Sequence, residues 1–72
     1  MQLTLFNIRK NLKGMTQQEV ADYLGISVQT YRAKEKGHYE FTQDEMFALS
    51  NLFDKEIGEI FLPRTHQFGN KG

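Results

Sequence analysis

The segment TQQEVADYLGISVQTY, residues 16–31, constrains the fold of this chain more than any other stretch. Thr16 is followed three residues later by Glu19, and this pair of side chains caps the start of a helix. Gly25 can take the left-handed conformation that ends a helix, and Ser27 can cap the next one. The pattern therefore predicts two short helices, one from Thr16 to Gly25 and one from Ser27 to about residue 36, where Gly37 ends it.

The packing side of these two helices follows from their apolar residues. The first is predicted to turn Val20, Tyr23 and Leu24 inward, with Ala21 where another helix must approach closely. The three or four residues of the connection, LGIS, include a glycine, which is the spacing of a helix-turn-helix. An ordinary helical hairpin has the same spacing, so this feature alone leaves both interpretations open.

Three further helical patterns surround this pair. Apolar residues from Leu5 to Met15, with Ile8 and Leu12 between them, predict a first helix over residues 3–13 that ends at Gly14. A second capping box predicts a fourth helix, and a short fifth helix or turn lies within residues 56–62. The capping pair is Thr42 and Glu45, the stripe of the fourth helix is Met46, Leu49, Leu52 and Phe53, and the inward residues of the fifth are Ile57, Ile60 and Phe61.

These elements predict an all-α fold, a compact bundle of four to five short helices that contains a helix-turn-helix. The 72 residues suit one small domain, which we place at residues 1–63 with Pro63 as its end. Residues 64–72, RTHQFGNKG, are polar and contain glycine, and we expect them to form a disordered C-terminal tail.

Composition excludes several kinds of site. The chain has no cysteine, so neither a disulfide framework nor a thiolate zinc site can form. No signal peptide and no membrane-spanning run are visible, and we expect a cytoplasmic protein of a bacterial host cell. His38 and His66 lack metal-ligand spacing, and neither a glycine-rich phosphate loop nor a nucleophile–base pair is visible. We therefore expect no cofactor, no metal and no enzymatic activity.

The charge of the chain is zero overall but uneven along its length. Residues 1–38 hold six Lys or Arg and three Asp or Glu, a net of +3, and residues 39–72 hold the reverse, a net of −3. Such a molecule could present a basic face to phosphate, or dock on a protein of opposite polarity.

The segments MTQQEVADYLGIS, EKG and DKEIGEIFLP carry a resemblance that covers about residues 8–63. The chain resembles the Cro/C1-type helix-turn-helix family of phage and bacterial transcriptional regulators. It is also similar to the modulator-of-repression antirepressors of temperate lactococcal phages. The resemblance implies a lambda-repressor-like bundle whose third helix enters the major groove while the second helix starts against phosphate. It further implies a role in the lysis–lysogeny switch, with a phage CI-type repressor as protein partner.

Transferred to this chain, the family pattern nominates residues of the second and third helices for contact with DNA or a partner. Gln29 is the best base reader, since its amide can pair with adenine, and Arg32 can reach guanine or phosphate. Ser27 and Thr30 are expected at phosphate oxygens. The full set is Gln17, Gln18, Ser27, Val28, Gln29, Thr30, Arg32, Ala33 and Lys36.

Three positions depart from the family pattern. Val28 and Ala33 occupy reading positions but have no group that hydrogen-bonds to a base. Lys34 replaces an apolar or tryptophan side chain, and we expect its stem at the edge of the core with the ammonium outside.

Two function classes therefore remain. One is an antirepressor that binds the CI repressor and alters its DNA binding. The other is a Cro-like dimer that binds double-stranded operator DNA itself. Solvated surface remains the alternative for Gln29 and Arg32, and tolerated surface for Val28 and Ala33.

Overall fold

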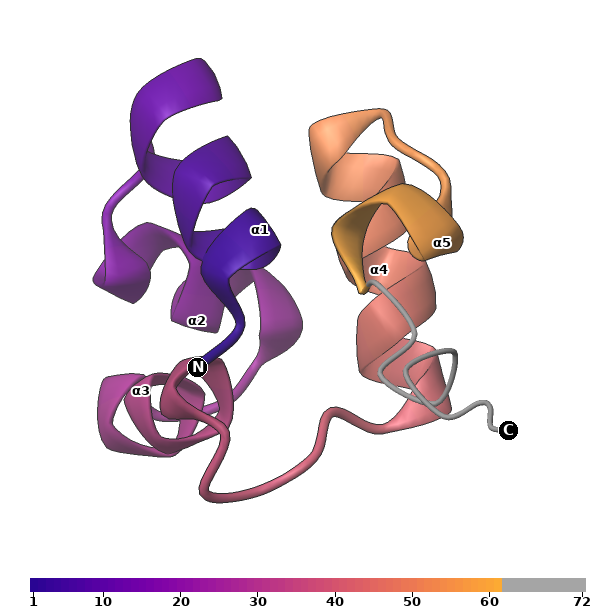
Figure 1. Cartoon of the computed structure of the whole chain (residues 1–72). Coiled ribbons are helices and arrows are strands. Elements are labelled where there is room, and N and C mark those ends of the chain that lie inside the picture. The colour runs from indigo at the N-terminus through magenta and orange to yellow at the C-terminus, as the bar shows by residue number, and fades with distance from the viewer. Residues whose placement is uncertain (62–72) are drawn as a thin grey trace.

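The computed structural model describes residues 1–61, and within them all regular secondary structure is helical. Two groups of helices face each other across the core, with α1, η1, α2 and α3 on one side and α4 and α5 on the other (Figure 1). The elements are α1 Leu3–Asn7, η1 Ile8–Leu12, α2 Gln17–Leu24, α3 Val28–Lys36, α4 Gln43–Phe53 and α5 Ile57–Ile60. The predicted all-α bundle with a helix-turn-helix is confirmed. The domain end at residue 63 and the tail lie outside the described residues.

The predicted helix starts and ends are confirmed at the middle of the chain. At α2, the hydroxyl of Thr16 accepts the N–H of Glu19 at 3.0 Å, and the Glu19 carboxylate accepts the N–H of Thr16 at 2.8 Å. Thr42 and Glu45 form the same reciprocal pair at α4. Gly25 follows α2 in the left-handed conformation, with φ of 75°. Local sequence alone therefore sets the bounds of these helices.

The first helix differs from its prediction because it changes type. After α1 the chain widens into the π-helix η1, in which the N–H of Lys13 donates to the carbonyl of Ile8 at 2.9 Å. The wider turn displaces later side chains around the axis. Leu12, predicted inward, is therefore 60% exposed.

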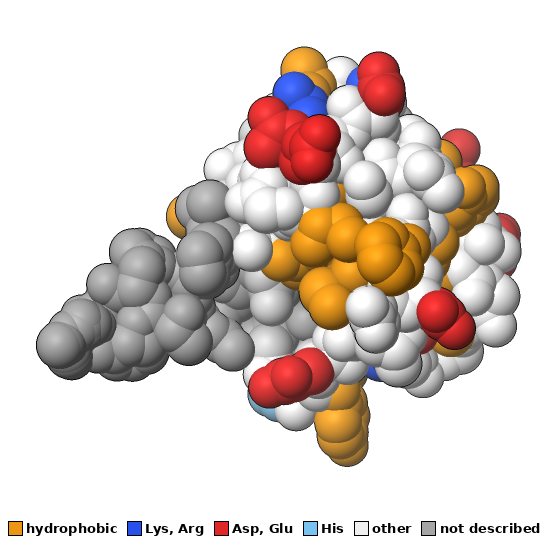
Figure 2. Space-filling model, turned by 90° about the vertical axis from the view of Figure 1, so that its right-hand side faces the viewer, with side chains coloured by type: hydrophobic (Ala, Val, Ile, Leu, Met, Phe, Trp, Pro, Cys, Tyr) orange, Lys and Arg blue, Asp and Glu red, His pale blue; other side chains and the backbone are white. Residues whose placement is uncertain are grey.

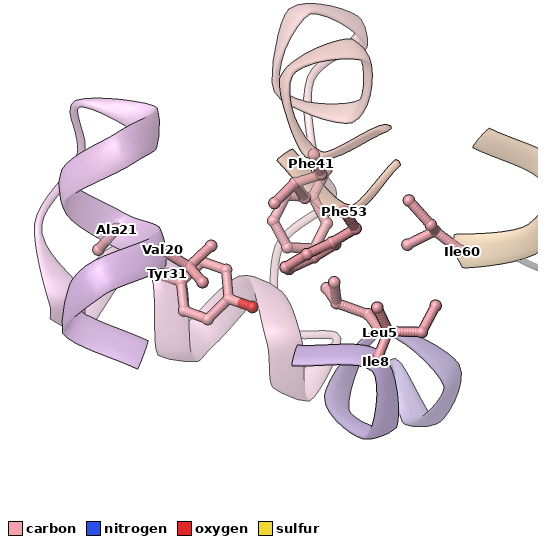
Figure 3. Close-up of a cluster of buried hydrophobic side chains, with 9 residues drawn as sticks. Leu5, Ile8, Val20, Ala21, Tyr31, Phe41, Phe53 and Ile60 are labelled. Atoms are coloured by element: carbon pink, nitrogen blue, oxygen red, sulfur yellow. The ribbon is translucent and has the colours of Figure 1, made fainter. Parts of the chain in front are cut away.

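The core gathers residues from every helix, with the buried rings of Tyr31, Phe41 and Phe53 among them, and Figure 3 shows the side chains turned toward one another. Tyr31 is fully buried, and its ring lies 6.0 Å from that of Phe41. The ring of the half-buried Phe61 lies 5.3 Å from that of Phe41. The buried set is Leu5, Ile8, Val20, Ala21, Tyr31, Phe41, Leu49, Phe53 and Ile60.

Tyr23 was expected inward and is instead 50% exposed. The buried face of α2 is centred between Val20, Ala21 and Leu24, and at 100° per residue Tyr23 lies about 110° from that centre. The prediction for the later helices is largely confirmed. Leu49, Phe53 and Ile60 are buried, and the remaining predicted residues, Met46, Leu52, Ile57 and Phe61, are half-buried.

Candidate functional site

The helix-turn-helix consists of α2, a three-residue connection and α3. Gly25 and Ile26 donate their N–H groups back to the last turn of α2, at 3.2 Å to Asp22 and 3.1 Å to Ala21. Ala21 is fully buried, so its small side chain allows the close crossing that the sequence predicted. The tight connection fixes α3 against α2 and leaves one side of α3 outside the bundle.

The outer side of α3 carries four of the predicted site residues together. Gln29, Arg32, Ala33 and Lys36 line an open depression. Spacings of three, four and seven residues place them along one face of the helix. The other side of the depression is formed by His38 and Tyr39.

Tyr39 was not predicted as a site residue. The chain folds back after α3, because Gly37 takes a φ of 91° and the N–H of His38 donates to the carbonyl of Ala33 at 2.9 Å. This leaves the Tyr39 side chain 67% exposed beside the depression. A helix-ending glycine two residues before an aromatic residue was the available signal, since it returns the chain toward the helix.

The other predicted residues lie around the helix starts. Ser27 caps α3 by accepting the N–H of Thr30 at 3.1 Å, and its hydroxyl donates to the Thr30 hydroxyl at 2.9 Å. Gln18 is exposed on α2 and donates to Asp22 at 2.8 Å. Val28 is half-buried and packs against the core, so it is not a free groove-facing side chain.

Gln17, at the start of α2, is held from two sides. Its amide nitrogen donates to Oε1 of Glu35 at 2.9 Å, and its amide oxygen accepts from Nε of Arg32 at 3.0 Å. A carboxylate only accepts and an arginine Nε only donates, so these two neighbours define which way the amide faces. The side chain therefore connects the surface of α3 to the interior.

Behind Gln17 lies a buried polar network that was not predicted from the sequence. Nε of Arg9 donates to Oε2 of Glu35 at 2.8 Å, and Nη1 donates to the carbonyl of Met15 at 2.8 Å. The hydroxyl of Tyr31 donates to the same carboxylate at 2.8 Å. The sequence did contain a signal, because Arg9 lies four residues after Leu5 on the apolar face of its helix.

The network shifts the ionisation of its members. Burial by itself raises the pKa of Glu35, but hydrogen bonds from Arg9, Gln17 and Tyr31 outweigh it, so the pKa lies below its ordinary value. Burial and the bond to Glu35 raise the pKa of Tyr31. Burial opposes the charge of Arg9, yet Glu35 raises its pKa overall. Glu35 and Arg9 are therefore a charged pair at neutral pH.

Lys34 also pairs within the fold, which differs from the expectation of an ammonium in water. Its Nζ lies 2.6 Å from the Glu45 carboxylate, and the two side chains are 12% and 13% exposed. Burial alone raises the pKa of Glu45, but bonds from Lys34 and Thr42 lower it overall. The ammonium also lies 6.0 Å from the centre of the Phe41 ring. This pair ties the end of α3 to the start of α4.

The two sides of the molecule differ in charge. In the group formed by α1, η1, α2 and α3, the exposed charged residues are Lys10, Lys13, Arg32 and Lys36 against Glu19 and Asp22. The face on the side of α4 and α5 has an apolar patch at its centre with acidic side chains spaced around it (Figure 2). On the face shown in Figure 2, a DNA phosphate would meet mainly negative charge. We therefore place the candidate site on α3 rather than on this face.

Other kinds of site find no support in residues 1–61. No group of three or more His, Cys, Asp or Glu side chains lies close enough there to hold a metal ion. None of the helices in this part of the chain is long and apolar enough to cross a membrane.

Comparison with known proteins agrees with this geometry. A helix-turn-helix family model matches residues 5–60. A curated relative is 37% identical over 51 residues, which cover 71% of this chain and 77% of that protein. It is an uncharacterized helix-turn-helix-type transcriptional regulator of Methanocaldococcus jannaschii. No solved structure matches the chain. On the evidence of the matched residues and of the α2–α3 geometry, the chain belongs to the Cro/C1-type helix-turn-helix family.

Proposed function

We propose that this protein is a transcriptional regulator that uses the outer face of α3 to bind a phage CI-type repressor and alter the DNA binding of that repressor. The observation that carries the proposal is the composition of the α3 depression. Ala33 and the 67% exposed Tyr39 lie there beside Arg32 and Lys36. Tyrosine and arginine around a small apolar site are typical of protein interfaces.

The outer face of α3 offers a single amide for reading bases, although Arg32, Lys36, His38 and Tyr39 are also polar. Gln29 is the one amide in the depression, and the Nε of Arg32 already donates to Gln17. Ala33 can do no more than touch a thymine methyl group. This balance favours a protein partner over direct base recognition.

A Cro-like dimer that binds operator DNA is the second candidate, and a different observation favours it. At the start of α2 the N–H groups of Gln17 and Gln18 have no partner inside the helix, as at any helix start. A depression beside them is also lined by Lys10. Backbone N–H groups with a nearby cation suit a phosphate oxygen, and Gln29 would then lie over the bases.

A fluorescence anisotropy titration separates the two candidates. The protein is added to a labelled early-promoter duplex, with and without the repressor, at low and near-physiological salt. The antirepressor proposal expects no sequence-specific binding by the protein alone and a changed affinity of the repressor for the duplex. Specific binding by the protein alone at physiological salt, with the repressor's affinity unaltered, would instead establish the Cro-like function.

A pair of variants tests the surface itself. Ala33→Asp adds a carboxylate within the depression, whereas Asn51→Asp adds the same charge at an exposed position of α4. We expect the first to abolish the complex and the second to leave it intact, with both variants folded by circular dichroism. Val28→Asp is unsuitable because Val28 packs against the core. Retention of the complex by Ala33→Asp would exclude the α3 face.

A further inference from the structure

We propose that Gln17 and Glu35 are positioning residues that fix Arg32 on the outer face of α3 and so determine which of its nitrogens a bound partner meets. This inference rests on the proposed function, since it assumes that the α3 face is the binding surface. It assigns a role to a buried carboxylate that never touches the partner.

The first step is the rigidity of the carboxylate. Glu35 is 1% exposed and receives bonds from Arg9 at both oxygens, at 2.8 Å and 3.2 Å. The Tyr31 hydroxyl adds a third bond at 2.8 Å. A buried group bonded on all sides has little freedom to rotate, so Oε1 of Glu35 is a fixed acceptor.

The second step is that the fixed Glu35 carboxylate orients Gln17, which in turn orients Arg32 at the surface. The Glu35 oxygen selects the amide nitrogen of Gln17, so the amide oxygen must face the opposite way. That oxygen accepts from Nε of Arg32 at 3.0 Å. Gln17 lies 15 residues before Arg32 in the sequence and orients this exposed arginine. Gln17 is in turn oriented by the Glu35 carboxylate inside the fold.

The third step concerns recognition. With Nε occupied, Arg32 offers its two terminal nitrogens to a partner, and these can bind both oxygens of one carboxylate end-on. In the proposed complex the matching group is therefore an acidic side chain of the repressor. An ordered arginine also loses less conformational entropy on binding than a free one.

The test begins in the free protein, where no partner is needed. Solvent exchange of the Arg32 Nε–H is measured by NMR in the wild type, Gln17→Leu and Gln18→Leu. Gln17→Leu removes the acceptor for Arg32, so we expect exchange about fivefold faster or more, the ratio that corresponds to one ordinary hydrogen bond. Gln18→Leu is the matched control, because Gln18 is the exposed neighbour of Gln17 on α2 and its amide donates to Asp22, not to Arg32 or Glu35.

The binding arm uses whichever macromolecule the wild type binds in the anisotropy experiment, the repressor or the duplex. Gln17→Leu is expected to weaken that binding about fivefold, and to have no further effect in an Arg32→Ala background. Equal effects of Gln17→Leu in both backgrounds, or unchanged Arg32 exchange in the free variant, would overturn the proposal. Binding carried by the duplex rather than the repressor would overturn the carboxylate assignment. If the wild type binds neither, the proposed function fails, and the exchange measurement still decides whether Gln17 positions Arg32.

Discussion

The buried pair of Arg9 and Glu35 makes the most demanding prediction for stability. Their side chains are 6% and 2% exposed, and removing one partner of such a pair leaves a buried charge without compensation. Arg9→Met or Glu35→Met should each cost about 3–5 kcal/mol of unfolding free energy. A domain of this size has about 3–9 kcal/mol in total, from about 0.05–0.15 kcal/mol per residue. Either single variant should therefore be largely destabilised.

The double variant distinguishes the physical cause. Arg9→Met with Glu35→Met removes both charges and fills the space with unbranched apolar chains, so no buried charge remains. The Tyr31 hydroxyl loses its acceptor, which costs about 1–3 kcal/mol. If the two single costs were additive, they would approach or exceed the whole unfolding free energy of the domain. We expect instead that the double variant is more stable than either single variant.

Urea unfolding followed by far-ultraviolet circular dichroism measures these differences. With a slope of about 1 kcal/mol/M, a loss of 3 kcal/mol lowers the midpoint by about 3 M. Lys10→Met is the matched control, since Lys10 is the exposed neighbour of Arg9 and its replacement should change stability by less than about 0.5 kcal/mol. Additive single costs below about 1 kcal/mol each would refute the reasoning, because that is how a solvated surface pair behaves.

Three further predictions concern single features. Gly25→Ala should cost about 1–2 kcal/mol of unfolding free energy in thermal unfolding, because the φ of Gly25 is 75°. Steric contact is not the cause, since no atom lies within 4 Å of an added Cβ. Gly58→Ala in α5 is the control and should not destabilise the fold; equal effects of the two variants would contradict the prediction. Because the pKa of Glu35 is lowered in the fold, its carboxylate stabilises the fold at any pH above the unfolded pKa of about 4.5, and this contribution is lost as pH falls through the folded pKa. The thermal midpoint should therefore decrease once the pH drops below about 4.5, and decrease less in Glu35→Gln. A thermal midpoint that does not change with pH would exclude this contribution. Lys34→Met should leave the Glu45 carboxylate without its ammonium partner and lower the urea midpoint, and an unchanged midpoint would show that the pair contributes nothing.

The sequence predicted those features that depend on neighbouring residues. The capping boxes at Thr16 and Thr42 and the turn at Gly25 each involve residues at most five apart, so local chemistry decides them. Four of the predicted surface residues are indeed gathered along α3.

Features that depend on distant partners did not follow from the sequence. The spacing of Leu5, Ile8 and Leu12 assumes a regular α-helix, and the π-helix at residues 8–12 breaks that assumption. Arg9 and Glu35 are 26 residues apart, and only the folded chain brings them together. The spacing of residues along the sequence carries no information on a pairing at this distance, so the charge count treats Arg9 and Glu35 like any other charged residues.

The pairing of these charges changes how the neutral composition bears on function. Arg9 and Lys34 account for two of the six cations in residues 1–38, and both are bound to carboxylates inside the fold. Lys10, Lys13, Arg32 and Lys36 are the exposed cations of that half, opposed by the exposed Glu19 and Asp22, so the exposed excess is +2 rather than +3. Affinity for DNA depends on the number of phosphates that a protein neutralises. A helix-turn-helix with so few exposed cations has little to offer to phosphates, and this agrees with the proposal that the α3 face binds a protein.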